Sequence, residues 1–222
     1  MIYRNVFFYH GMPNFPPTFE PKTCKTALDN YFPSCPSNLP HSTMAASRVV
    51  LILGAGPRVG AAVASKFASN GYAVAIASRS GTGQKNDKGF LSLRADFTQP
   101  DTIPPLYEAV KAEFKAFPNV VVYNAAALTV PPVAESLLSI PVDKVVGDLN
   151  VNTVSAYAAA QQAINGWETL AADVKKTFIY TGNALNTIVS PTPMMLNLGT
   201  GKSASAYWLG SADAAYAGKG YR

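Results

Sequence analysis

One lysine in this sequence stands where a chemical role would be expected. The segment from Leu198 to Lys202 reads LGTGK, and it opens a stretch rich in Ala and Ser that predicts a helix over 199–218. Side chains four residues apart lie on the same face of a helix. One turn before Lys202, that face carries Leu198, which has no proton to give. The sequence therefore offers a cation for binding or catalysis without an obvious acidic partner.

Other common catalytic groups are confined to the start of the chain. Both cysteines and both histidines precede residue 44: His10, Cys24, Cys35 and His41. Their spacing matches no zinc finger, and we interpret them as incidental. Because the rest of the chain has no thiol and no imidazole, it excludes Cys nucleophiles, His bases and Cys/His zinc sites there.

A glycine-rich turn is the clearest binding signal. GAGPRVG (54–60) follows an apolar run, RVVLIL (48–53), and precedes a predicted helix over 59–70. Glycine allows a tight turn and a close approach to a pyrophosphate, and a helix N-terminus offers free N–H groups. The motif in this context favours dinucleotide binding. The alternative is an ordinary strand-to-helix turn.

Strands and helices alternate from residue 48 onward. The strands are predicted at 48–53, 72–78, 90–97, 119–126 and 175–182, and the helices at 59–70, 103–117, 141–164 and 199–218, with 80–89 as a loop. This alternation predicts an α/β fold, a doubly wound parallel sheet (Rossmann fold) in a single domain, with ligands at the carboxyl ends of the strands.

The first 43 residues differ from the rest in composition. They contain seven prolines and show no sustained hydrophobic period, so we expect residues 1–43 to be a disordered, dispensable extension and residues 44–222 to form the NAD(P)-binding domain. The net charge of +5 comes from scattered residues, which argues against a nucleic-acid surface. Apolar runs are too short to span a bilayer and no signal peptide is evident. We therefore expect a cytoplasmic protein with no membrane or nucleic-acid partner.

Several motifs together resemble the short-chain dehydrogenase/reductase family, over about residues 46–222. The family's glycine motif, T-G-x-x-x-G-x-G, matches at Gly54 and Gly60, whereas Leu53 replaces its Thr and Arg58 its middle Gly. ADF (95–97) resembles the motif in which Asp96 would accept from the adenine amino group. NAA (124–126) is similar to the N-A-G motif that lines the cofactor. The resemblance implies a cofactor site made of Gly54, Gly56, Arg58, Val59, Gly60, Arg79, Asp96, Phe97, Asn124, Ala125 and Lys202.

The same resemblance assigns catalytic positions. NVNTVSAY (150–157) matches the helix that carries the family's catalytic Asn, at Asn152, and Lys202 falls on the catalytic Lys, which would hold the nicotinamide ribose. The family's Ser position falls in YTGN, so Thr181 or Asn183 would have to serve there, or no residue does. In the family a Tyr acts as the general acid, and its position is occupied here by Leu198. Losing a general acid costs about 10²–10⁴ in rate.

Three tyrosines could in principle substitute for the missing acid. Tyr157, Tyr180 and Tyr207 lie in or near the expected site elements, but we expect core packing for each. A second departure is length, since the family continues after the helix over 199–218 with a sixth strand, a lid and a seventh strand. We therefore expect these C-terminal strands to be missing from the fold.

The charge of the residues after the second predicted strand indicates whether the cofactor is NAD or NADP. A free ribose hydroxyl favours a carboxylate after the second strand, and a 2′-phosphate favours an arginine. Here Ser78 and Arg79 follow that strand, no acid occurs before Asp87, and Arg58 adds a second cation. NADP (NADPH) is therefore preferred, although both arginines could simply be solvated.

The sequence leaves two functions open. The first is an NADP-dependent oxidoreductase that transfers hydride to a small carbonyl-type substrate through an atypical active site. The alternative is a non-catalytic NADP-binding sensor or scaffold, which Leu198 favours. A homo-oligomer through the helices at 141–164 and 199–218 is a further expectation.

Overall fold

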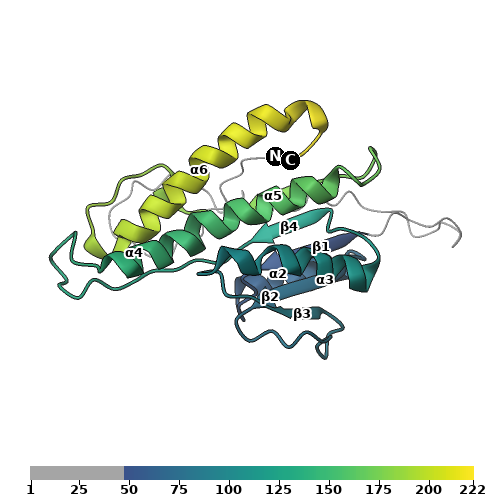
Figure 1. Ribbon diagram of the computed structural model, residues 1–222, viewed down its shortest axis with the longest axis horizontal. Coiled ribbons are helices and arrows are strands. Elements are labelled where there is room, and N and C mark those ends of the chain that lie inside the picture. Colours follow the sequence, from purple (N-terminus) through teal and green to yellow (C-terminus); the bar gives the residue numbers. More distant parts are fainter. Residues whose placement is uncertain (1–47) are drawn as a thin grey trace, which may run out of the picture.

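The fold is a parallel sheet covered by helices, seen in a computed structural model that describes residues 48–222 (Figure 1). Its strands are ordered β3-β2-β1-β4-β5, and each pairs with its neighbours in parallel. Their bounds are β1 Val49–Leu53, β2 Ala73–Ser78, β3 Leu91–Arg94, β4 Val120–Tyr123 and β5 Thr177–Tyr180. The predicted single-domain, doubly wound α/β fold is confirmed.

The helices follow the strands in the predicted order. The α-helices are α2 Val59–Ser69, α3 Pro104–Phe114, α4 Val142–Leu149, α5 Ser155–Trp167 and α6 Leu196–Tyr216, with short 3₁₀ turns at Pro100–Thr102, Ala184–Asn186, Pro193–Met195 and Ala217–Lys219. Pro104 and Pro105 open α3, where a missing N–H leaves no helix bond unmade. No helix within residues 48–222 is both long and apolar enough to cross a membrane.

Alternate residues of the central strand face two different cores. Val49, Leu51 and Leu53 of β1 lie in one cluster with the buried side chains of α3, α5 and α6. Val50 and Ile52 lie in the other, against α2. All five β1 residues have no exposed surface. Because both faces of the sheet are covered, the strand reads as a continuous apolar run rather than an alternating one.

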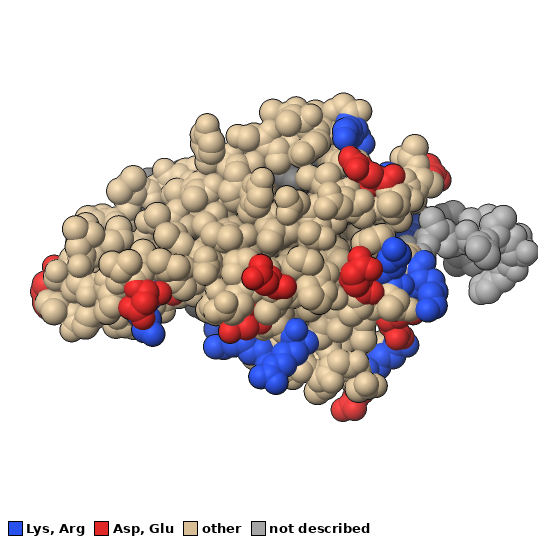
Figure 2. Space-filling view, in the orientation of Figure 1, with Lys and Arg blue, Asp and Glu red and all other residues tan. Residues whose placement is uncertain are grey.

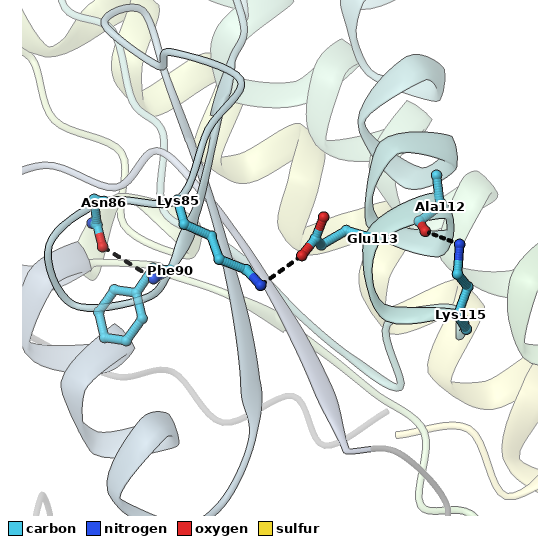
Figure 3. Close-up of polar contacts among 6 residues, drawn as sticks. All are labelled: Lys85, Asn86, Phe90, Ala112, Glu113 and Lys115. Atoms are coloured by element: carbon cyan, nitrogen blue, oxygen red, sulfur yellow. Dashed lines mark hydrogen bonds and ion pairs between the residues drawn. The ribbon is translucent and has the colours of Figure 1, made fainter.

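The predicted loop at 80–89 is partly regular and covers the edge of the sheet. Lys85 forms an antiparallel bridge with Leu91, and Gly83 N–H donates to the Ser92 main-chain oxygen at 2.7 Å. The Lys85 ammonium also lies 2.7 Å from the Glu113 carboxylate on α3, so this segment is tied to the neighbouring helix (Figure 3). The main-chain groups of edge strand β3 are therefore paired rather than open to another chain.

The predicted single helix over 141–164 contains a wider turn. Between α4 and α5, residues Asn150–Val154 form one π-helical turn, and the three pieces run on as one rod (Figure 1). Asn152 lies at the centre of this turn. Such π turns are frequent at functional sites and have no simple sequence signature, so its position could not be predicted.

The last two residues lie alongside β5. Tyr221 bridges Lys176 in parallel, Arg222 N–H donates to the Lys176 oxygen at 3.0 Å, and Phe178 N–H donates to the Arg222 oxygen at 2.7 Å. The family's C-terminal strands would follow at this place. The expected extension over 1–43, with its cysteines and histidines, lies outside the described residues.

Candidate functional site: a dinucleotide cleft with an altered catalytic face

In the glycine turn at the end of β1, other main-chain atoms lie so close to two glycines that no side chain would fit there. Gly54 has φ +90°, and a Cβ there would lie 2.3 Å from the Ala125 nitrogen. The Asn124 side-chain amide donates to the Gly54 oxygen at 2.9 Å, which joins the ends of β1 and β4. At Gly60 a Cβ would lie 2.6 Å from the Ala55 Cα. Gly54, Gly60 and Asn124 are therefore required for the turn itself.

Gly56 differs from these two glycines, because a Cβ there would meet nothing within 4 Å. The turn is thus open above Gly56. Within residues 48–222, the main-chain N–H groups of Arg58, Val59 and Gly60 at the start of α2 have no acceptor. Free donors beside open space suit a diphosphate, which the positive end of a helix dipole also favours. The residues present therefore fit the pyrophosphate of a dinucleotide.

Arg79 and Asp96, which are expected from the sequence to recognise the nucleoside, lie at the ends of β2 and β3. Arg79 follows β2 directly and is exposed. Asp96 follows β3, and its Oδ1 accepts from the Thr98 hydroxyl at 2.7 Å and the Thr98 N–H at 3.0 Å. These bonds, with a smaller contribution from the Arg79 charge, lower the pKa of Asp96. The Phe97 side chain instead packs edge-to-face on Tyr123 in the core, and its main-chain oxygen accepts from the Ser155 hydroxyl at 2.8 Å.

Asn152 is fully buried and fixes the segment after β4. Its Oδ1 accepts from the Ala127 N–H at 2.9 Å, and its Nδ2 donates to the Ala127 oxygen at 2.8 Å. Its main-chain oxygen accepts from the hydroxyls of Tyr180 at 2.7 Å and Ser205 at 2.9 Å. Asn152 therefore joins three elements, and its side-chain amide is committed to structure.

Lys202 lies on the second turn of α6 and is only 3% exposed. Its ammonium donates to the Thr181 oxygen at 2.7 Å and lies 4.4 Å from the centre of the Tyr180 ring. No carboxylate within the described residues forms an ion pair with it. Burial lowers the pKa of Lys202 to about 8, because desolvation disfavours the charged form. The predicted cation is thus present beside Asn152, with donor hydrogens to spare.

Thr181, a predicted catalytic residue, reaches this region mainly through its main chain. Its hydroxyl donates to the Tyr123 oxygen at 3.3 Å, while its own oxygen accepts from Lys202. The alternative, Asn183, caps the turn over Ala184–Asn186 by accepting from the Leu185 N–H at 3.0 Å. The Thr181 hydroxyl is thus engaged with a main-chain oxygen, and Asn183 uses its side-chain oxygen for capping; its amide N–H groups are too weakly acidic to act as a general acid.

Leu198 is half-buried on α6, one turn before Lys202. Of the three tyrosines considered as substitutes, Tyr180 is buried and its hydroxyl donates to Asn152, in agreement with core packing. The same expectation is wrong for Tyr157 and Tyr207, which are 54% and 81% exposed. Their helices turn these rings outward, away from the core. None of the three supplies a free phenol beside Lys202.

A buried carboxylate that was not predicted from the sequence also lies at the site. Asp148, on α4, is 6% exposed, and its Oδ2 accepts from the Thr129 N–H at 2.9 Å and from the Asn197 amide at 3.0 Å. These bonds tie α4 to the start of α6, next to Leu198. Asp148 stands four residues before Asn152 in the sequence, and this spacing could have indicated that both residues lie on the same face of a helix. Within residues 48–222 no three His, Cys, Asp or Glu side chains group to hold a metal.

This geometry defines a Rossmann-type protein built to hold a dinucleotide at the carboxyl edge of its sheet. Comparison with known proteins narrows the class. The chain is 35% identical over 186 residues to the short chain dehydrogenase/reductase dmxR12 of Cryptosporiopsis sp. (strain 8999), covering 79% of this chain and 74% of that protein. It belongs to the short-chain dehydrogenase/reductase family.

Solved structures agree on the fold. A short-chain type dehydrogenase/reductase from Mycobacterium marinum superposes with a TM-score of 0.68 at 23% identity, over 80% of this chain and 70% of that one. A short chain dehydrogenase from Burkholderia cenocepacia J2315, in complex with NADP, gives 0.64 at 22% identity, over 79% and 71%. No protein-family model matches the chain.

Proposed function

We propose that the protein is an NADPH-dependent reductase that transfers hydride to the carbonyl carbon of a small molecule. The observation that carries the cofactor choice is the charge at the end of β2, where Arg79 follows the strand and no acid occurs before Asp87. A guanidinium suits the 2′-phosphate of NADPH, whereas the ribose of NADH favours a carboxylate. The related Burkholderia protein is known with NADP.

The cofactor would lie across the carboxyl ends of the strands. Arg58, Val59 and Gly60 would receive the pyrophosphate, Asp96 the adenine, and Asn124 and Ala125 would line the cleft. Lys202 would hold the nicotinamide ribose, because its ammonium lies nearly buried with hydrogens free beyond Thr181. Bound NADPH supplies the hydride.

Among residues 48–222, the groups considered for proton donation beside Lys202 are not available for it. Leu198 has no proton to give, and the hydroxyls of Tyr180 and Thr181 are committed to main-chain oxygens. In the proposed reaction, water therefore donates the proton to the carbonyl oxygen. Without a positioned acid, the rate is expected to be about 10²–10⁴ lower than with one.

Titration with NADPH and NADH, followed by quenching of protein fluorescence and then by loss of NADPH absorbance with a panel of carbonyl compounds, tests both parts. We expect NADPH to bind at least about tenfold more tightly, since hydrogen bonds to a charged group contribute more than neutral ones. Equal affinity for the two cofactors would contradict the assignment of Arg79.

A non-catalytic NADP-binding sensor or scaffold is the second candidate, and Leu198 favours it. The same titration separates the two functions: tight NADPH binding with no oxidation by any carbonyl compound, at high enzyme concentration, supports the sensor. Slow but substrate-dependent oxidation supports the reductase.

We also propose self-association through α5 and α6. Val154, Tyr157 and Tyr207 are large apolar side chains exposed on the neighbouring helices, and a shared apolar face of this kind suits a two-fold contact. Sedimentation of the wild type and of Tyr207→Glu checks this, with a dimer expected for the first and a monomer for the second.

A further inference from the structure

Exposed apolar side chains occur on two separate segments that follow strands at the proposed site. One segment follows β4 and the other follows β5. The residues, here called the apolar rim, are Leu128, Val130, Val133, Ile188, Val189 and Met194, with exposures from 39% to 94%. Exposed apolar groups are ordinary when they are scattered singly, but a group gathered from two loops marks a binding surface.

Hydrogen bonds anchor both segments to residues around the proposed site. Asn152 holds Ala127 in both directions, immediately before Leu128, and Asp148 accepts from the Thr129 N–H. On the other side, Lys202 donates to the Thr181 oxygen.

Hydrogen bonds involving α4 and α6 also hold the two segments. The Ser203 hydroxyl on α6 donates to the Leu185 oxygen at 2.8 Å, and Asp148 on α4 accepts from Asn197 on α6. Both segments lie at the end of the molecule where α4 and α6 begin (Figure 1). The apolar rim therefore lies at the site of Lys202 and Asn152, not on a remote surface.

Charge is nearly absent from these segments. Residues 181–201 contain no charged side chain, and residues 124–142 contain only Glu135. The surface over the segment before α6 shows no charged group in Figure 2, whereas charged groups lie over the sheet with its flanking helices and at the end where α4 begins. With Lys202 assigned to the ribose, residues 124–142 and 181–201 themselves offer no cation to receive an acidic or phosphorylated substrate.

We propose that the substrate is a neutral carbonyl compound whose body is mainly hydrocarbon or aromatic, and that the apolar rim binds that body. The proposal rests on the proposed reductase function, because that function places the carbonyl beside Lys202. Polyhydroxylated and anionic substrates are excluded by the same surface, because it offers few polar partners to replace the water that they lose.

The test uses one carbon skeleton in two forms, 4-phenylcyclohexanone and 4-(4-carboxyphenyl)cyclohexanone. Binding is measured by calorimetry with and without saturating NADPH, and reduction by loss of NADPH absorbance. We expect the neutral ketone to bind at least about tenfold more tightly than the carboxylate. Equal or tighter binding of the carboxylate would overturn the proposal.

Val189→Asp probes the rim directly, since Val189 is 94% exposed and the change disturbs no packing. We expect it to weaken binding of the neutral ketone about tenfold, the effect of removing one aliphatic contact and adding a charge, while NADPH affinity stays unchanged. Ala172→Asp adds the same charge on the loop before β5, at the opposite edge of the sheet, and should change neither. An unchanged ketone affinity in Val189→Asp would also overturn the proposal.

The readouts separate this inference from the proposed function. If NADPH does not bind but the neutral ketone binds and Val189→Asp weakens it, the reductase function fails and the apolar site stands. If Val189→Asp instead converts a dimer to a monomer in sedimentation and leaves ketone affinity unchanged, the rim is a contact between copies and the substrate proposal is wrong.

Discussion

The ammonium of Lys202 donates a 2.7 Å hydrogen bond to the main-chain oxygen of Thr181, the first residue after β5. This contact joins the carboxyl edge of the sheet to the second turn of α6. It also holds a cation in a place that is 3% exposed and has no ion-pair partner within residues 48–222. Burying a charged ammonium without an ion-pair partner lowers the free energy of unfolding. The burial of Lys202 can therefore be tested by stability measurements without any ligand.

The cost appears as a dependence of stability on pH. Burial lowers the pKa of Lys202 from 10.5 to about 8, so between these values the unfolded chain binds more protons than the folded one. Stability due to this group therefore rises with pH through that window and is constant below it. We expect Lys202→Met to be more stable than the wild type near neutral pH, and this difference to shrink by roughly 3 kcal/mol by pH 10.5.

Urea unfolding of both proteins across this pH range measures the difference directly, and effects of other groups cancel in it. Lys175→Met is the matched control, because Lys175 is exposed and should show no such window. A difference between Lys202→Met and wild type that stays constant with pH would show that the ammonium is well solvated.

A second prediction concerns the contact between α6 and the π turn. A Cβ on Gly201 would lie 2.4 Å from the Cβ of Asn152, whereas nothing lies within 4 Å of the corresponding atom on Gly210. We expect Gly201→Ala to destabilise the fold by about 1–3 kcal/mol through overpacking. Gly210→Ala should stabilise it by about 0.5–1 kcal/mol, because Ala favours a helix interior. Thermal unfolding measures both, and equal effects of the two would refute the close packing of α6 on Asn152.

The sequence predicted the positions of the proposed cofactor residues better than the contacts around Lys202. The glycine turn, Asp96 and Asn124 lie at strand ends, whose positions follow from alternating apolar runs. Asp148 was missed because its partners, Thr129 and Asn197, lie 19 and 49 residues away, and such pairings are fixed only by packing. The outward direction of Tyr157 and Tyr207 was also missed, since a weakly amphipathic helix does not state which face is covered.

The contacts of the loop at 80–89 could not be predicted from local sequence either. Its Gly and Ser content indicated a turn, and it does connect β2 to β3. Its pairing with β3 and the Lys85–Glu113 ion pair depend on α3 lying beside that edge. Local composition predicts that a chain turns, but contacts with other elements determine what the turn covers.

Cofactor preference is the third prediction. Arg79→Asp should reverse the preference from NADPH to NADH, because a carboxylate repels the 2′-phosphate and accepts from the free ribose hydroxyl. The expected loss of NADPH affinity is about tenfold or more. Arg48→Asp makes the same change of charge before β1, at the opposite edge of the sheet, and should leave the ratio unaltered. If both variants lose NADPH affinity equally, overall charge rather than Arg79 accounts for binding.

The final prediction restores an acid beside Lys202. Leu198→Tyr places a phenol one helical turn before the ammonium and on the same face of α6. The neighbouring charge would lower the pKa of that phenol and favour proton donation. We expect NADPH oxidation with a neutral ketone to rise by about 10²-fold, the usual contribution of a general acid.

Leu198→Phe is the control for this gain, because it adds the same ring without the hydroxyl. If the phenol donates the proton, only the Tyr variant gains activity, and adding Lys202→Ala to it removes most of the gain. NADPH affinity, measured in parallel by fluorescence, shows whether Lys202→Ala also loosens the ribose. Equal rates for the Tyr and Phe variants would mean that position 198 does not face the reacting carbonyl. If Lys202→Ala then weakened NADPH binding without any rate effect of position 198, Lys202 would act in cofactor binding alone, and the sensor function would become the better account of the protein.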